Sequence, residues 1–296
     1  MRENKVVYGL IGYGGMGRWH TEILSNVPEA VIGGIYDIKE EKREEAKEKG
    51  FFVYETEEAM LADPDIDVVL IATPNDCHKP IAIRAMHAGK NVISEKPVTL
   101  SSTDLLEMEN AAKETGKLLT VHQNRRWDDD FLIIKKLVEE QKLGHVFRIE
   151  SRVHGSRGIP GDWRKEKIHG GGMVLDWGVH LLDQILYMYG DRKIETVYAS
   201  LTNVTNQEVD DGFTAILTFE GGTEVLVEVG TNNYISLPRW YVLGEDGTAV
   251  IRDWQLNGEI IRKTGRTEET VVPVKTAAGL TKTMAPRRED TIVKED

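Results

Sequence analysis

The chain has 296 residues, of which 40% are hydrophobic and 29% are charged, and its formal net charge at pH 7 is −12. These values are typical of an ordinary globular protein of about two domains, and the acidic charge, which no basic patch offsets, disfavours a nucleic acid as partner. The single cysteine, Cys77, excludes an internal disulfide. With no signal-peptide pattern and no apolar run as long as a membrane span, we expect a cytoplasmic protein with no membrane partner.

The first part of the chain alternates between strand patterns and helix patterns. The expected strands are residues 5–11, 30–37, 67–74, 91–97 and 118–123. The expected helices are one that opens at the glycine-rich turn after the first strand, and residues 38–50, 78–89 and 102–116. This order predicts an α/β fold with a doubly wound parallel Rossmann sheet over residues 1–122.

The glycine-rich turn "GYGGMG" spans residues 12–17 and has the spacing of a dinucleotide-binding loop. Gly12 permits a tight turn, Gly14 lets a diphosphate approach the backbone, and Gly17 lets the helix pack closely on the strand. A diphosphate would then lie at the positive end of the helix dipole. The alternative is a structural turn in some other parallel α/β protein.

Asp37 ends the second strand, 20 residues after Gly17, where an acid that binds ribose is expected. A carboxylate there accepts hydrogen bonds from the ribose hydroxyls and repels a 2′-phosphate, so NAD is favoured over NADP. Lys39, Lys42 and Arg43 could screen such a phosphate, although the alternative is that they form a solvated helix face.

Polar residues also follow the later strands of this sheet, where ligands bind in doubly wound folds. Thr73 and Asn75 follow the third strand, and Glu95 and Lys96 follow the fourth. From position alone, Lys96 could equally be a catalytic amine or a surface lysine at the end of a strand.

Beyond residue 145 the pattern changes to alternating apolar and polar residues around glycine turns, which predicts antiparallel hairpins. The segments with this pattern are residues 145–155, 196–205, 212–230 and 239–253. One helix, expected over residues 173–189, interrupts them. Residues 123–296 are therefore expected to form a second, α+β domain for substrate binding and oligomerisation, with an open and mainly antiparallel sheet.

The interrupting helix carries a polar stripe on an otherwise apolar surface. At about 100° per residue, one face of the helix holds Asp176, His180, Asp183 and Tyr187. The stripe has no Lys, Glu, Arg or Gln, so we expect it to face an internal cleft. The alternatives are a face turned to solvent and a metal pair; no further ligand stands at a recognisable spacing, and no metal site is predicted. Glycines 170–172 before the helix could admit a nicotinamide ring.

The chain resembles the glucose-fructose oxidoreductase and inositol dehydrogenase (Gfo/Idh/MocA) family of NAD(P)-dependent oxidoreductases. The motifs that carry the resemblance are "GYGGMG", "ATPNDCH", "AGKNVISEKP" and "GGGMVLDWGVHLLD", which occur in order within residues 5 to about 260. The segment "HQNRRWDDDFLIIKKL" is similar to a subgroup that acts on sugars and cyclitols. The resemblance implies a homo-oligomer, a dimer or a tetramer, and a final helical segment that "MAPRREDTIVKED", residues 284–296, does not match.

The resemblance also implies roles for individual residues. His180 would be the base, which suits an imidazole with an ordinary pKa of about 6.5. Asp176 would support the imidazole or contact a substrate hydroxyl, and Lys96 would hydrogen-bond the reacting oxygen. The other expected substrate contacts are His154, Arg157, Trp163 and Arg164. The expected cofactor contacts are Gly12, Tyr13, Gly14, Gly15, Met16, Gly17, Asp37, Thr73, Asn75, His78, Glu95, Lys96 and Asn124.

Three functions are compatible with these patterns. The first is an NAD-dependent dehydrogenase that oxidises a secondary alcohol of a sugar, a sugar derivative or an inositol, with the nicotinamide as hydride acceptor. The second is an NAD-dependent glycosidase that works by transient oxidation and elimination. The third is a sensor that binds dinucleotide and sugar without turnover, which has no need of Lys96 and His180. Arg125, Arg126 and Trp127 are expected to hold the two domains together.

Overall fold

A computed structural model describes residues 4–263, 274–281 and 292–295. The chain forms two compact units, each described separately below. The first unit comprises Met1–Asn124, Ile159–Val179 and Asn206–Val209, and the second comprises Arg125–Gly158, His180–Thr205 and Asp210–Asp296. The single domain boundary near residue 122 stays a prediction, and the first unit also contains two later segments of the chain.

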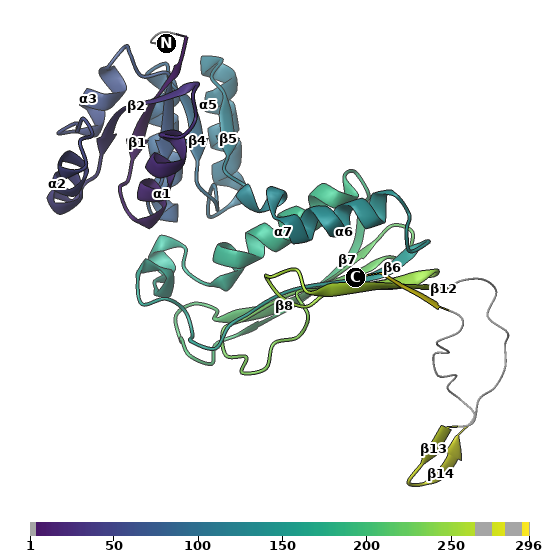
Figure 1. Ribbon diagram of the computed structural model, residues 1–296. Coiled ribbons are helices and arrows are strands. Elements are labelled where there is room, and N and C mark those ends of the chain that lie inside the picture. The colour runs from purple at the N-terminus through teal and green to yellow at the C-terminus, as the bar shows by residue number, and fades with distance from the viewer. Residues whose placement is uncertain (1–3, 264–273, 282–291, 296) are drawn as a thin grey trace. The chain divides into compact units, whose positions relative to one another are not determined.

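The first unit is built on a five-stranded parallel sheet in the order β2-β1-β3-β4-β5 (Figure 1). Its strands are β1 (Val6–Ile11), β2 (Ala30–Tyr36), β3 (Val68–Ile71), β4 (Asn91–Ser94) and β5 (Leu119–Val121). The order reverses between β1 and β3, and ligands of doubly wound sheets bind beyond the strand ends at such a point. The predicted Rossmann sheet is therefore confirmed.

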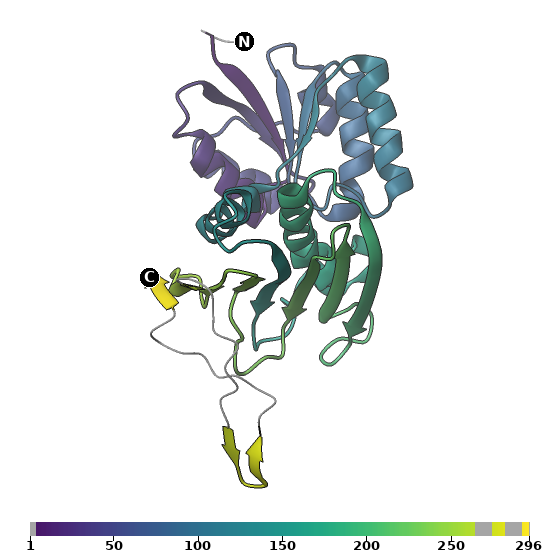
Figure 2. The ribbon, with the colours of Figure 1, turned by 90° about the vertical axis from the view of Figure 1, so that its right-hand side faces the viewer.

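Helices cover both faces of this sheet, as Figures 1 and 2 show. They are α1 (Gly15–Leu24), α2 (Glu40–Glu48), α3 (Glu57–Ala62), α4 (His78–His87) and α5 (Ser102–Thr115), with a short 3₁₀ turn η1 (Asn75–Cys77). Alternate residues of β3 point to opposite faces: Val69 packs with Met60 of α3 and Met86 of α4, whereas Leu70 packs in a second cluster with Ala46 of α2. Two apolar layers hold the strand ends in place.

The second unit contains an eight-stranded sheet in the order β15-β12-β11-β10-β6-β9-β8-β7. Neighbouring strands are antiparallel except for the parallel pair β6 and β9. The strands are β6 (Val146–His154), β7 (Ile194–Thr202), β8 (Gly212–Phe219), β9 (Glu224–Gly230), β10 (Trp240–Gly244), β11 (Gly247–Ile251), β12 (Gly258–Lys263) and β15 (Ile292–Glu295). Strands β13 (Val274–Thr276) and β14 (Gly279–Thr281) pair separately. The expected open, mainly antiparallel sheet is confirmed.

Helices α6 (Asp129–Glu139) and α7 (Val179–Tyr189) lie along one face of this sheet (Figure 1). Phe131 of α6 packs on Trp240 of β10 with ring centroids 6.3 Å apart, and Tyr189 of α7 stacks on Phe219 of β8 at 4.7 Å. The other face is uncovered within the described part of the unit: the edge strand β7 exposes most of its residues.

The prediction of a continuous α-helix over residues 173–189 is wrong for its first part. Residues Val174–Gly178 form a π-helix, η5, and the α-helix α7 starts only at Val179. A π turn closes i→i+5 hydrogen bonds, so a wheel of 100° per residue does not apply across it. Asp176 lies within the π turn, and its predicted stripe with His180 rests on the wrong period.

Helix α6 and strands β12 to β15 of the second unit have no counterpart among the predicted elements. The expected lack of a closing helix concerns residues 284–296, of which 284–291 and 296 lie outside the described residues. Residues 292–295 form β15, which pairs antiparallel with β12. In the described part of the chain, every helix is too short or too polar to cross a membrane.

Candidate active site and cofactor-binding loop

The glycine loop between β1 and α1 has two positions that exclude any side chain. Gly12 has φ +96°, and a Cβ atom there would lie 2.5 Å from the Ala72 carbonyl oxygen. A Cβ at Gly17 would lie 2.1 Å from the carbonyl oxygen of Gly12. Both contacts are with backbone atoms, so the loop and α1 depend on glycine at these positions.

The start of α1 offers free space and positive charge together. At Gly14 and Gly15 an added Cβ would meet nothing within 4 Å. The N-cap is Gly14, no side chain caps it, and the first turn carries no acid. The N–H groups of this turn therefore face an open position, which fits a diphosphate. Met16, in the same turn, is 37% exposed.

Asp37 connects the glycine loop to the end of β2. Its Oδ2 accepts a hydrogen bond from the Tyr13 N–H at 2.7 Å, and its Oδ1 accepts one from the Lys39 N–H at 2.8 Å. A carboxylate has about four acceptor sites, so positions for ribose hydroxyls remain. The Tyr13 ring is buried against Phe51 and contributes to the loop through its backbone.

Two of the three cations that could screen a 2′-phosphate, Lys42 and Arg43, have hydrogen-bond partners for their side chains among the described residues. Lys42 donates to Glu45 at 2.9 Å. Arg43 donates to the carbonyl oxygens of Asp37 and Ile38, at 2.8 and 3.2 Å. Arg43 therefore binds the backbone beside Asp37, the residue predicted to contact ribose, rather than lying free on the solvated face of α2.

Lys96 and Asp176 meet within the first unit, although 80 residues separate them in sequence. The Lys96 Nζ lies 3.0 Å from Asp176 Oδ1 and 2.9 Å from the Asp176 carbonyl oxygen. Each side chain is 16% exposed, so the pair is largely desolvated but reachable. Burial alone would raise the pKa of Asp176, but the cations of Lys96 and Arg164 outweigh it and lower the pKa.

Arg164 and Trp163 extend this pair. The Arg164 Nε lies 3.3 Å from Asp176 Oδ2, so the carboxylate bridges two cations. The Arg164 guanidinium lies over the Trp163 ring, 4.6 Å from its centroid, and both side chains are half-buried. Of the residues predicted for the substrate pocket, Arg164 thus contacts the carboxylate that binds Lys96, and Trp163 contacts Arg164. Arg157 lies on an exposed segment of the second unit.

The glycines before the π turn are required by the chain's own packing. A Cβ at Gly170, where φ is +69°, would lie 2.2 Å from a methyl carbon of Leu100. One at Gly171 would lie 2.3 Å from the carbonyl oxygen of Arg164. Asn75, which is 3% exposed, donates from Nδ2 to the Gly170 carbonyl oxygen at 2.9 Å. These contacts explain the glycines without a nicotinamide ring.

The polar residues after Asp176 fall in the second unit. His180 is 5% exposed. Asp183 forms a bidentate ion pair with Arg126, at 2.7 and 2.6 Å, and the same guanidinium lies 4.6 Å from the centre of the Tyr187 ring. Tyr187 is 45% exposed, so the prediction that the whole stripe faces an internal cleft is wrong for this residue. Arg126, expected to hold two domains together, pairs within the second unit.

His154 also has its partners within the second unit. Its side chain is 2% exposed, its Nδ1 accepts a hydrogen bond from the Leu237 N–H at 3.2 Å, and its Nε2 lies 3.2 Å from Glu228 Oε1. The hydrogen bond from His154 is the main cause of a lowered pKa at Glu228. The predicted substrate contact of His154 stays a prediction, and these contacts give it a structural role.

His78 and Glu95, both predicted to contact the cofactor, have close partners at the strand ends. The ring nitrogens of His78 lie 2.8 Å from the Pro97 carbonyl oxygen and 3.0 Å from that of Thr73, and burial lowers the pKa of His78. His78 therefore joins two loops of the first unit. Asn124 begins a half-buried 3₁₀ turn, η2 (Asn124–Trp127).

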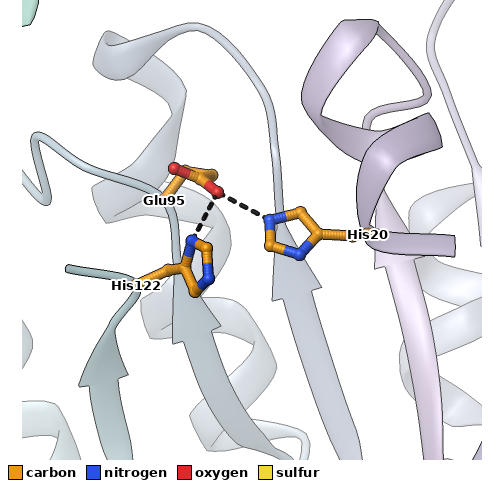
Figure 3. A group of neighbouring side chains, drawn as sticks. All are labelled: His20, Glu95 and His122. Carbon is orange, nitrogen blue, oxygen red and sulfur yellow. Dashed lines mark hydrogen bonds and ion pairs between the residues drawn. The ribbon is translucent and has the colours of Figure 1, made fainter. Parts of the chain in front are cut away.

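The Glu95 carboxylate is contacted by two histidines that the sequence did not single out. Its Oε1 lies 2.6 Å from His20 Nε2 and 3.0 Å from His122 Nδ1 (Figure 3). Burial would raise the pKa of Glu95, but the hydrogen bonds from both imidazoles outweigh it and lower the pKa to about 2. No motif links residues 20, 95 and 122, so sequence spacing could not reveal this group.

The comparisons with known proteins agree with this geometry. Residues 6–123 match a family model described as an oxidoreductase family with an NAD-binding Rossmann fold, and residues 131–250 match the GFO/IDH/MocA C-terminal domain. Over 244 residues the chain is 31% identical to scyllo-inositol 2-dehydrogenase (NADP(+)) IolW of Bacillus subtilis. The aligned region covers 82% of this chain and 67% of that protein.

Two solved structures extend the comparison. An NAD-binding protein from Listeria innocua superposes with a TM-score of 0.88 at 50% identity, over 98% of this chain and 80% of that one. The WlbA dehydrogenase from Chromobacterium violaceum, a complex with NADH and UDP-GlcNAcA, gives a TM-score of 0.77 at 25% identity, over 85% and 75%. The chain spans about half the length of several curated relatives that it matches, between 45% and 53%.

Proposed function

Because the chain belongs to the Gfo/Idh/MocA oxidoreductase family and contains its NAD-binding Rossmann domain, we propose that it is a dehydrogenase. The proposed reaction is hydride transfer between NAD(H) and a secondary alcohol of a sugar, a sugar derivative or an inositol. The fit of the glycine loop and of Asp37 to a dinucleotide supports NAD(H) as the cofactor.

The observation that carries the proposal is the pairing of Lys96 with Asp176. A desolvated ammonium group held by a carboxylate can donate a hydrogen bond to a carbinol oxygen and stabilise the charge that develops there. Asp176 fixes the position of the amine, and the charges of Lys96 and of Arg164, which lies at the other carboxylate oxygen, lower the pKa of Asp176.

We assign the remaining roles from the chemistry that the reaction requires. Bound NAD supplies the hydride acceptor. His180 is the proposed proton acceptor, because an imidazole is the side chain best suited to general-base work near neutral pH. Trp163 and Arg164 are proposed substrate contacts: the aromatic ring offers a surface for the apolar face of a sugar, and the guanidinium offers donors for its hydroxyls.

The proposed substrate class follows from the same polar groups and from two relatives. One relative is named for scyllo-inositol, and a structural neighbour is a complex with NADH and UDP-GlcNAcA. NAD is proposed as the preferred cofactor because the carboxylate of Asp37 repels a 2′-phosphate, although the inositol relative is named for NADP(+). Arg43 donates to the carbonyl oxygen of Asp37, and a parallel assay with NAD and NADP tests whether this cation offsets the repulsion.

A homo-oligomer is proposed from the uncovered face of the second unit. Tyr198, Ile216 and Leu226 are neighbours in register across β7, β8 and β9, and Tyr198 is 63% exposed. A row of apolar side chains on an open sheet favours burial against a second copy. Light scattering should give a mass above one chain for the native protein and a smaller mass for Tyr198→Asp. A cytoplasmic location stays a prediction.

The experiment that tests the function is a screen of sugars and inositols with NAD and NADP in parallel, followed by the absorbance of the reduced cofactor. We expect reduction of NAD with at least one polyol and a lower kcat/KM with NADP. Cleavage of a glycoside without accumulation of NADH would replace the proposed reaction with the glycosidase mechanism. Cofactor binding with neither reaction would support a sensor.

A further inference from the structure

The group formed by His20, Glu95 and His122 lies outside the chemistry assigned to Lys96 and Asp176. Its members come from three places in the first unit: helix α1, the residue after β4 and the residue after β5. Figure 3 shows both imidazole rings directed at the same carboxylate. From these three side chains, we propose that the protein binds one divalent transition-metal ion of the zinc class.

The donor atoms are already gathered. One nitrogen of each histidine and one oxygen of Glu95 lie within 4.8 Å of one another. Ligands of a tetrahedral zinc ion lie about 2.1 Å from the metal and therefore about 3.4 Å apart. The present separations of 2.6 and 3.0 Å between the Glu95 oxygen and the two nitrogens need to widen by less than about 1 Å. This is the only such group among the described residues.

The donor set favours zinc, cobalt or nickel over magnesium or calcium. Two imidazoles and one carboxylate suit borderline transition metals, whereas magnesium and calcium prefer oxygen ligands alone. Three protein ligands leave one position of a tetrahedral site for water or a small anion. His122 is 26% exposed, whereas His20 and Glu95 are 5% and 6% exposed, so His122 is the ligand on the solvent side.

The surroundings would support a bound ion. The Trp19 ring packs beside both imidazoles, with its centroid 5.2 Å from that of His20 and 5.7 Å from that of His122. Glu95 accepts two imidazole contacts on one oxygen, and its other oxygen lies 3.2 Å from the Lys96 N–H. The carboxylate is thus oriented before a metal arrives, and an ion there would restrain the segment that carries Lys96.

The direct test is a titration of the metal-free full-length protein with Co²⁺, followed by visible absorbance, with Zn²⁺ as competitor. We expect one Co²⁺ per chain, a spectrum typical of nitrogen and oxygen ligands, and displacement by one equivalent of Zn²⁺. The proposal makes no use of substrate turnover, so a failure of the proposed dehydrogenase function would leave this result unaffected.

The variants identify the ligands. His122→Ala, at the most exposed ligand, should weaken Co²⁺ binding by at least about a hundredfold, because even residues behind a metal's ligands contribute ten- to a hundredfold in affinity. Glu95→Gln should abolish the spectrum. His87→Ala, an exposed histidine on α4, is the matched control and should bind as the native protein does. Equal binding by native, His122→Ala and His87→Ala proteins, or no binding at all, would overturn the proposal.

Discussion

Asp176 and Asp130 are both carboxylates paired with a cation, but they differ in their exposure to solvent. In the first unit, Asp176 lies between Lys96 and Arg164, and the carboxylate and Lys96 are each 16% exposed. In the second unit, Asp130 pairs with Arg239 at 3.1 Å, and both are 3% exposed. The charged groups of the Asp176 pair are therefore accessible to solvent, whereas those of the Asp130 pair are buried.

Asp130 and Arg239, the buried pair, also form hydrogen bonds with other buried residues of the second unit. Asp130 Oδ2 accepts a hydrogen bond from the indole N–H of Trp240 at 2.9 Å, which ties α6 to β10. Arg239 donates to the Arg152 carbonyl oxygen at 3.0 Å, and burial lowers the pKa of Arg239. The comparison teaches that an ion pair does not by itself indicate a catalytic role. A pair can act on a substrate only where solvent, and therefore the substrate, reaches its charged atoms.

The largest effect is expected from Lys96→Met. The substitution keeps the length of the side chain but removes its charge, so kcat should fall by about 10² to 10⁴, the range for loss of one transition-state donor or proton-handling group. The dissociation constant for NADH should change much less than kcat, because the other predicted cofactor contacts, the glycine loop and Asp37, stay in place. The measurement is steady-state kinetics on the substrate found in the screen, together with NADH fluorescence.

Lys79 provides the control for that variant. It forms surface ion pairs with Asp104 and Glu107 in the same unit, and Lys79→Met should leave kcat unchanged. Equal turnover by the Lys96→Met protein and the native protein would show that Lys96 has no catalytic role. The Lys96–Asp176 pair would then be a structural pair, like Arg239–Asp130.

Arg239→Met should affect stability rather than turnover. Loss of one partner from a buried pair leaves an uncompensated charge and costs about 3–5 kcal/mol in the free energy of unfolding. Denaturant unfolding should show this loss, while kcat at a temperature where the variant is folded should stay within about threefold of native.

A double variant tests whether the uncompensated charge causes this loss of stability. Asp130→Asn in the Arg239→Met background removes the orphaned charge and should restore part of the lost stability. If the double variant is less stable than Arg239→Met alone, the carboxylate stabilises the fold through Trp240 and not through its pairing with the arginine.

Glu228 is a third paired carboxylate, and its contribution to stability should depend on pH. Its folded pKa is lowered, first by the hydrogen bond from His154, so its stabilising effect is present above the ordinary pKa near 4.5 and is lost as the pH falls through the lower folded value. Glu228→Gln should cost about 1–2 kcal/mol in the free energy of unfolding at pH 7 and less at pH 3. A cost that stays constant from pH 7 to pH 3 would contradict this assignment.

The last effect concerns the choice of cofactor and is expected at Asp37, whose carboxylate accepts hydrogen bonds from two backbone N–H groups and has no ion-pair partner among the described residues. Asp37→Ser removes the repulsion of a 2′-phosphate, and the ratio of kcat/KM for NAD to that for NADP should fall by about tenfold to a hundredfold, equivalent to about 1.4–2.7 kcal/mol. An unchanged ratio would show that Asp37 does not set the choice of cofactor.

The sequence predicted the features that depend on local pattern. Gly12 and Gly17 follow a strand and open a helix, and the structure shows that each excludes a side chain by a backbone contact. The period-two pattern predicted the strands of the second sheet. The meeting of Lys96 with Asp176 agrees with the expected grouping of these two residues, which rested on resemblance and not on spacing.

The features that sequence could not predict depend on long-range packing. The π turn at Val174–Gly178 changes the period of the helix through its hydrogen bonds, and an apolar pattern with a period of 3.6 does not reveal it. Asp183 belongs to a polar stripe in sequence, yet its carboxylate binds Arg126. His20 and His122 carry no motif and meet at Glu95 only because the parallel sheet brings the ends of β4 and β5 together beside α1.

The central claim, that Lys96 and Asp176 act as one unit, is tested most directly by a double-mutant cycle on kcat with Lys96→Met and Asp176→Asn. Groups that act together give non-additive losses. We predict that the double variant is within about threefold of Lys96→Met alone. Losses that multiply, so that the double variant shows the product of the two single effects, would contradict the account.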